Sequence, residues 1–81
     1  MSIQLSKKAA KSLKNINEPE KTRIKNAIKG IPNGDIKKLQ GSNNQYRLRL
    51  GDWRIVFSYI NEEIILIEKI APRGQVYRGI N

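Results

Sequence analysis

The 81-residue chain contains neither cysteine nor histidine. Without cysteine it can form no disulfide bond and no thiolate metal site. Without histidine it lacks the side chain that most often serves as a general base or as a metal ligand. Zinc chemistry and Ser-His catalytic triads are therefore excluded, and we expect no cofactor.

Long hydrophobic runs are missing as well. The longest, IILI at residues 64–67, is far too short to cross a bilayer. Met1 is not followed by the apolar stretch of a signal peptide. These absences fit a cytoplasmic protein that has no membrane partner. The length allows a single domain with one modest core, over residues 1–81.

Acidic side chains are few. Sixteen Lys and Arg stand against seven Asp and Glu, which gives a formal net charge of +9. Such an excess on a small domain indicates an anionic partner, and the candidates are nucleic acid, an acidic protein and an anionic membrane surface. Many of the lysines fall between residues 6 and 30. The simplest interpretation is a solvated helix face, and the alternative is a surface that attracts a polyanion without reading its sequence.

The first half of the chain is predicted to form a short strand and two helices. The strand is SIQL at residues 2–5, and a serine-capped helix follows over residues 6–15, with its apolar residues on one face. Asn17 is placed to cap a second helix, with Pro19 in its first turn and Gly30 at its end. The two helices are predicted to pair as a short antiparallel hairpin.

From about Gln45 onward the apolar residues recur with a period of two, which predicts three antiparallel strands. The pair Gly51-Asp52 signals a two-residue hairpin turn. If the chain turns there, one face of the sheet carries Tyr46, Leu48, Leu50, Trp53, Ile55, Phe57 and Tyr59. The helices can cover that face. The predicted fold class is α+β, with an N-terminal strand and a helix hairpin packed on one face of a small antiparallel sheet.

Arginine is concentrated on the other face of the same hairpin. Arg47, Arg49 and Arg54 share this face with Val56 and Ser58. The register sets Arg49 directly opposite Arg54 on what we expect to be an exposed strand pair. Like charges so placed destabilise a sheet by roughly a few tenths to 1 kcal/mol. A site that awaits anionic charge explains the cluster better than a solvated face, and the planar guanidinium group suits phosphate.

Residues 38–78 carry several short motifs in a fixed order. These are K-L-x-G, Y-R-x-R, G-D-W-R, an acidic turn, an apolar strand and a closing R-x-x-x-Y. The combination resembles the RelE/ParE superfamily of toxins, and its RelE branch in particular. The order of the elements matches too, so the resemblance covers nearly the whole chain.

The resemblance implies a toxin of a type II toxin–antitoxin system with a RelE-like fold. Such a toxin is a small, metal-independent endoribonuclease, or mRNA interferase, that cuts mRNA, typically in the A site of the ribosome. The expected partners are therefore mRNA, the ribosome and a cognate acidic antitoxin that is encoded beside the toxin and neutralises it.

The resemblance also carries the family's functional positions onto five residues. They are Arg47 and Arg49 on the first hairpin strand, Arg54 on the next strand, Arg73 in the loop after the last strand, and Tyr77. Some members have lysine at the first two positions. Because arginine keeps its charge in proteins, Arg47 and Arg49 cannot be general bases here.

The implied reaction can be written without histidine or metal. The RNA 2′-OH would attack the adjacent phosphate and leave a cyclic phosphate and a free 5′-OH. Guanidinium groups are suited to stabilise the charge that builds up on the equatorial oxygens of the transition state. Tyr77 is the candidate base, because surrounding arginines favour its phenolate, and Arg73 or Arg54 would assist the leaving oxygen.

Two other functions remain open. A ParE-like protein would share the fold and the antitoxin, but it would inhibit DNA gyrase by protein contact without a catalytic site. A non-catalytic homologue would be a basic module that binds RNA or the ribosome. The arginine cluster together with Tyr77 favours the RelE branch over both.

Overall fold

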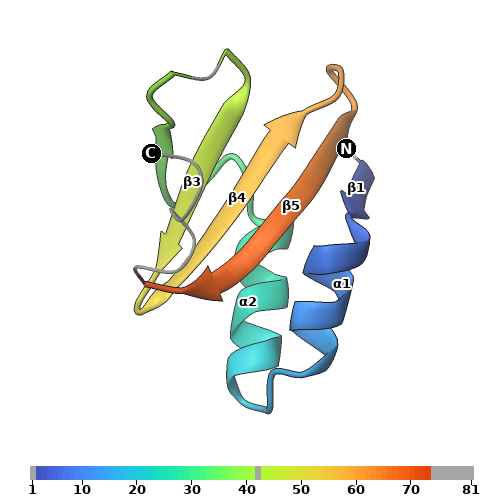
Figure 1. The fold of residues 1–81 in the computed structure, drawn as a ribbon, viewed down its shortest axis with the longest axis vertical. Coiled ribbons are helices and arrows are strands. Elements are labelled where there is room, and N and C mark those ends of the chain that lie inside the picture. The colour runs from blue at the N-terminus through green and yellow to red at the C-terminus, as the bar shows by residue number, and fades with distance from the viewer. Residues whose placement is uncertain (1, 42, 74–81) are drawn as a thin grey trace.

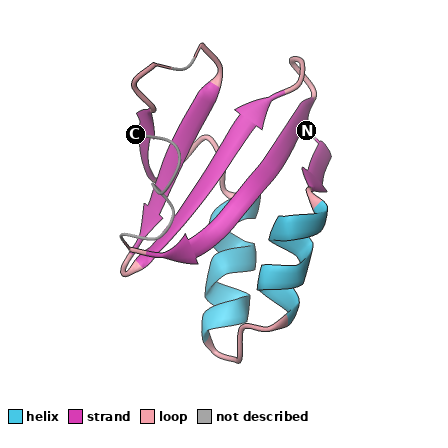
Figure 2. Ribbon diagram, viewed as in Figure 1, coloured by secondary structure: helices cyan, strands magenta, loops and turns pink. Residues whose placement is uncertain are grey.

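The computed structural model describes residues 2–41 and 43–73. It places two helices on one face of a five-stranded sheet (Figure 1, Figure 2). The helices are α1 (Lys7–Lys14) and α2 (Glu20–Lys29). The strands are β1 (Ser2–Leu5), β2 (Asp35–Lys38), β3 (Gln45–Leu50), β4 (Trp53–Tyr59) and β5 (Ile64–Pro72). The predicted α+β fold, with a helix hairpin on one face of the sheet, is confirmed.

The strands lie in the order β1-β5-β4-β3-β2. Strands β2 to β5 form an antiparallel meander, and β1 lies parallel to β5. The N-terminal strand is therefore the neighbour of the last strand in the sequence (Figure 1). Neither helix in the described ranges is long and apolar enough to span a membrane.

Helix α1 begins as predicted. The Ser6 hydroxyl accepts a hydrogen bond of 3.0 Å from the Ala9 N–H, as an N-cap does. The same hydroxyl donates to the Glu68 carbonyl at 2.8 Å, so the helix start is fixed to β5. The apolar face then buries Ala9 and Leu13 against the sheet.

Helix α2 begins differently from the prediction. Pro19, and not Asn17, holds the N-cap position, and it makes no side-chain cap. The Glu18 side chain bonds to the first turn instead. Its Oε1 accepts from the Thr22 hydroxyl at 2.6 Å and from the Thr22 N–H at 2.9 Å. The bond from the Thr22 hydroxyl, and after it the bond from the Thr22 N–H, hold the pKa of the Glu18 carboxyl below its usual value. The helix ends at Gly30, as predicted.

Strand β2 has no counterpart in the prediction. Its sequence, DIKK, contains one apolar residue, so no alternation marks it as a strand. Ile36 is half-buried on the core side, and the flanking charged side chains are exposed. β2 pairs with β3 and sets Asp35 opposite Arg49 and Lys37 opposite Arg47. A short, charged strand of this kind is typical of a protected sheet edge.

The core lies between the helices and the sheet face that the sequence assigns to it. Leu48, Ile55 and Phe57 are buried there, with Ile65 and Ile67 of β5. Tyr46 and Tyr59 at the margin contact each other and the buried Phe57, with ring centroids 5.4–5.8 Å apart. Leu50 and Trp53 pack at the edge of the same cluster, so the predicted core face of the hairpin is confirmed.

Strand β5 contains a bulge. Phe57 pairs with Ile67, but Val56 pairs with Lys69, which leaves Glu68 as an extra residue opposite this pair. A bulge re-aims side chains next to it. Here the Glu68 side chain joins Ser58, on the sheet face that the helices leave uncovered.

Candidate nucleic-acid interface

The hairpin turn between β3 and β4 brings the arginines together. Gly51 has a φ of 55°, the left-handed region that favours glycine. Across the strands Arg49 pairs with Arg54 and Arg47 pairs with Val56, which is the predicted register. Because core residues alternate with these positions, the three arginines lie on the face opposite the helices. We call this surface, with Val56 and Ser58, the arginine face.

Arg54 is buried, with 6% of its surface exposed. The expectation that it sits on an exposed strand pair is therefore wrong. Its Nη1 donates to the carbonyl of Gly51 at 2.7 Å and to the carbonyl of Trp53 at 2.9 Å. The guanidinium group thus folds back over the turn and binds two of its carbonyls. Arg49, its partner across the ladder, remains exposed as predicted.

Arg47 is also buried, with 8% of its surface exposed, although it was expected on an open face. Its Nη1 lies 3.6 Å from Oδ1 of Asp35, a half-exposed residue of β2. Among the described residues this buried Nη1 has no hydrogen-bond partner. An unsatisfied buried donor costs about 1–3 kcal/mol, and more when it is charged. The atom therefore keeps an N–H that could donate to an anionic oxygen.

Arg73 lies at the same end of the sheet. Its backbone N–H donates to the Asp52 carbonyl at 2.6 Å, so the residue is held against the hairpin turn, and its side chain is exposed. Arg54 binds the two carbonyls on either side of Asp52. Arg54 and Arg73 thus meet at one turn. Tyr77, the fifth predicted site residue, lies outside the described residues.

The arginine face includes a carboxylate that sequence reasoning did not assign. Glu68 Oε2 accepts from the Ser58 hydroxyl and Oε1 accepts from the Gln45 amide, both at 2.6 Å. The bulge turns the Glu68 side chain to this face, and no sequence motif predicts the bulge. Next to this polar group Val56 packs with Ala71. A part-buried acid thus lies on the same face as the arginines.

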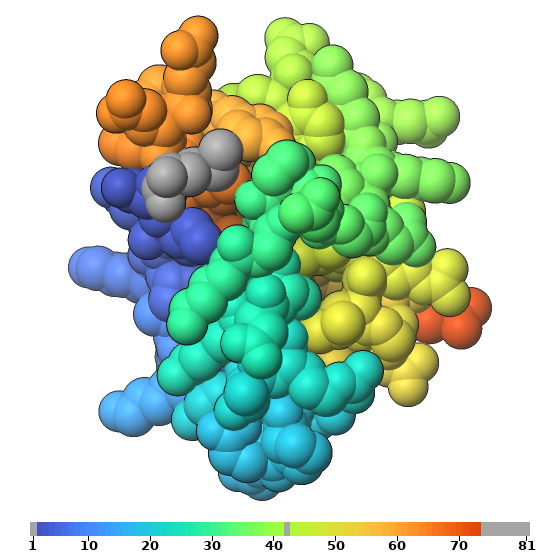
Figure 3. Space-filling model, turned by 180° about the vertical axis from the view of Figure 1, so that it is seen from behind, coloured from blue at the N-terminus to red at the C-terminus, as the bar shows by residue number. Residues whose placement is uncertain are grey.

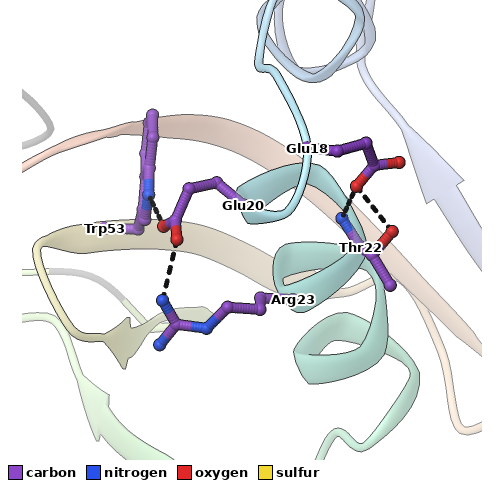
Figure 4. A network of polar contacts seen from close by, with 5 residues as sticks. All are labelled: Glu18, Glu20, Thr22, Arg23 and Trp53. Carbon is purple, nitrogen blue, oxygen red and sulfur yellow. Dashed lines mark hydrogen bonds and ion pairs between the residues drawn. The ribbon is translucent and has the colours of Figure 1, made fainter.

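Trp53 points the other way, to the helices (Figure 4). Its indole N–H donates to Glu20 Oε2 at 2.8 Å, and Arg23 Nη1 donates to Glu20 Oε1 at 2.8 Å. The bond from Trp53, and after it the bond from Arg23, hold the pKa of the Glu20 carboxyl below its usual value. Glu20 thus connects the hairpin turn to the start of α2. Figure 3, which views the molecule from the helix side, shows these two segments side by side.

The described residues offer a cationic surface and no metal site. Within residues 2–41 and 43–73 no three His, Cys, Asp or Glu side chains are grouped so that they could hold a metal ion. The chemistry available is that of guanidinium groups that differ in burial and in partners. Such groups bind phosphate by charge-assisted, paired hydrogen bonds. This chemistry is compatible with an anionic ligand.

Comparison with known proteins gives consistent matches. The family model described as the ParE toxin of the type II toxin-antitoxin system parDE matches residues 3–77. Toxin RelE3 of Methanocaldococcus jannaschii is 31% identical over 85 residues, which cover 95% of this chain and 96% of that protein. The toxin in the crystal structure of a RelB-RelE antitoxin-toxin complex from Methanococcus jannaschii is 27% identical, with a TM-score of 0.76 over 96% of this chain and 99% of that one.

A more distant match is to the intact RelBE toxin-antitoxin complex of E. coli. It has 16% identity and a TM-score of 0.70, and it covers 91% of this chain and 96% of that chain. At that identity the likeness concerns the fold alone. Two helices on a mostly antiparallel five-stranded sheet are thus shared well beyond the range of close sequence similarity.

Proposed function

We propose that this chain, which belongs to the RelE/ParE family of type II toxin–antitoxin toxins, is an endoribonuclease that cleaves mRNA in the ribosomal A site. The observation that carries the proposal is the buried Nη1 of Arg47, which has no hydrogen-bond partner among the described residues. It lies on the same face as exposed Arg49 and turn-bound Arg54. A phosphodiester on this face would satisfy Arg47 and offset the like charges of the other two.

In the proposed reaction the RNA 2′-oxygen attacks phosphorus, and the bond from phosphorus to the 5′-oxygen breaks. The products are a 2′,3′-cyclic phosphate and a 5′-OH. Arg47, Arg49 and Arg54 stabilise the added negative charge on phosphorus-bound oxygens, and one such contact is worth about 2.7–4 kcal/mol. Tyr77 takes the proton from the 2′-OH, a role that rests on the family resemblance. The exposed Arg73 would stabilise the charge on the departing 5′-oxygen, which takes its proton from water.

An acidic antitoxin is the proposed regulator. The solved relatives are toxins bound to RelB antitoxins, and this chain carries a net charge of +9. An acidic partner would screen that charge and cover the arginine face. Since the proposed substrate is translated mRNA, the proposed location is the cytoplasm. Association should weaken as salt rises, because exposed charges are screened over roughly 8 Å at physiological ionic strength.

A gyrase inhibitor is the second candidate, because the matched family model is described as a ParE toxin. Such a protein would need its basic surface only for protein contact. It would need no set of arginines gathered on one sheet face. The clustering of Arg47, Arg49 and Arg54 therefore supports the ribonuclease over the gyrase inhibitor.

The deciding experiment is primer extension on mRNA from cells that express the chain. We expect discrete cleavages within codons, and their loss when translation is blocked. Arg49→Ala should abolish them, while Lys29→Ala, which removes the same charge from α2, should leave them in place. A supercoiling assay with purified gyrase runs alongside. If supercoiling is inhibited and mRNA stays intact, the protein is a ParE-like gyrase inhibitor and the ribonuclease proposal is wrong.

A further inference from the structure

A recess of about 460 Å³ lies between α1 and the end of β5. Trp53 and Pro72 line it, together with Lys8 and Ser12 of α1 and with Asn15, the C-cap of that helix. Its volume is within the range of about 300–1,000 Å³ that small-molecule sites occupy. We call it the Trp53 recess. Of the proposed catalytic positions that the structure describes, Arg47, Arg49, Arg54 and Arg73, none lines it.

The walls combine an aromatic plane with polar groups. The hydrogen bond from the indole to Glu20 fixes the orientation of Trp53, so the ring presents one defined surface. Lys8, Ser12 and Asn15 are spaced i, i+4 and i+7, which places them on one side of α1. They supply a cation, a hydroxyl and an amide, and the last two both donate and accept hydrogen bonds. An unpaired nucleobase needs a surface of this kind, with a π-face to stack on and polar groups at its edge.

The recess adjoins the arginine face through the hairpin turn. Pro72, in its wall, precedes Arg73, whose N–H is bonded to the Asp52 carbonyl. Trp53, which also lines the recess and pairs with Pro72 across β4 and β5, supplies one of the carbonyls that Arg54 binds. A strand whose phosphate contacts Arg54 or Arg73 therefore needs to pass only the end of β5 to reach the recess.

We propose that the Trp53 recess accepts one unpaired nucleobase of the RNA strand that the arginine face holds. The base stacks on Trp53, Ser12 and Asn15 contact its edge, and Lys8 binds an adjoining phosphate. This rests on the proposed function and adds a second anchoring point, which positions the strand relative to the scissile phosphate. A protein partner that inserts a side chain is the competing occupant.

The test uses the full chain and a six-nucleotide 2′-O-methyl RNA, which cannot be cleaved because it has no free 2′-OH. Trp53 is the only tryptophan, so its fluorescence reports on the recess. Anisotropy of a labelled copy reports binding anywhere on the protein. We expect quenching that saturates together with the anisotropy. An abasic residue at one position should abolish the quenching and weaken binding about five- to 150-fold, the effect of losing one stacked base.

Matched lysines provide the protein-side control. Lys8→Ala should lower the slope of log affinity against log salt by about 0.7, because it removes one contact to a phosphate of a single strand. Lys7→Ala removes the same charge from the neighbouring position of α1, outside the recess, and should leave the abasic pattern unchanged.

The outcomes separate the two proposals. Binding that requires Arg49 but leaves Trp53 fluorescence unchanged, or quenching that no abasic position alters, would overturn the recess as a base site and leave the ribonuclease intact. Equal effects of Lys7→Ala and Lys8→Ala on the salt slope would also count against the recess. Absence of any RNA binding by the unaltered chain would overturn the recess as a base site, while primer extension on translated mRNA would still decide the ribonuclease proposal.

Discussion

Arg54 donates a hydrogen bond of 2.7 Å to the Gly51 carbonyl, so the arginine that faces Arg49 across the hairpin also closes the turn that pairs them. A purely electrostatic view treats these arginines as equivalent. The structure separates them into a buried group with acceptors and an exposed group that faces solvent. The two should therefore respond differently to substitution.

Arg54→Leu should lower the free energy of unfolding by about 1.5–3 kcal/mol, the value of hydrogen bonds from a charged donor. Arg49→Leu should leave stability unchanged or raise it by about 0.2–1 kcal/mol, because it removes like-charge repulsion from the strand pair. Urea denaturation of both variants measures this. Equal stabilities for the two would show that the hydrogen bonds of Arg54 contribute nothing.

Asp35 competes with anions for Arg47, because its Oδ1 lies 3.6 Å from the unpartnered Nη1. Asp35→Asn should therefore tighten the binding of 2′-O-methyl RNA. The stability cost should stay below about 1 kcal/mol, since the carboxylate is half-exposed and screened. Glu62→Gln changes the net charge equally at the β4–β5 turn and serves as the control. An equal gain in RNA affinity from both substitutions would show that the effect comes from net charge and not from the contact between Asp35 and Arg47.

The bond between Trp53 and Glu20 should be sensitive to acid. Because the pKa of Glu20 lies below its usual value of 4.5, its stabilising effect is present above that pH and is lost as the pH falls through the folded-state value. Trp53 emission should thus shift with a midpoint below 4.5. Glu20→Gln should lose this transition, while Glu63→Gln, in the β4–β5 turn, should keep it. A transition that survives Glu20→Gln would belong to another group.

Tyr77→Phe should lower the cleavage rate by about 10²–10⁴-fold, the usual contribution of a general base. RNA affinity should change little, because the aromatic ring is retained. Tyr59→Phe, in the aromatic group at the margin of the core, is the control and should cut at the original rate. Single-turnover cleavage on programmed ribosomes provides the measurement. Undiminished cleavage by Tyr77→Phe would assign the proton transfer elsewhere.

The hairpin was predictable because local rules govern it. Gly51-Asp52 set the turn, and alternation on either side then fixed which residues face the core. The start of α1 followed from Ser6 in the same way. Where two local signals competed, as at Asn17 and Pro19, sequence reasoning chose the wrong cap, because Glu18 bonds to Thr22 instead.

Features that depend on distant contacts were not predictable. Strand β2 forms because β3 offers it an edge, and its own four residues carry no pattern. The burial of Arg47 and Arg54 depends on neighbouring strands and on turn carbonyls. The position of Lys8 beside Trp53 brings together residues 45 apart in sequence. The candidate site was therefore recognisable by residue type, while the environment of each arginine was not.

The parallel pairing of β1 with β5 has a consequence for synthesis. Ser2 lies opposite Ile64, so the contact joins segments about as far apart as the described chain allows. Contacts of such long sequence separation form late in folding, because a large loop must close first. β1 therefore finds its partner, and the core closes over Ile65 and Ile67, only after β5 has left the ribosome. A nascent chain should thus lack its complete core until β5 is released.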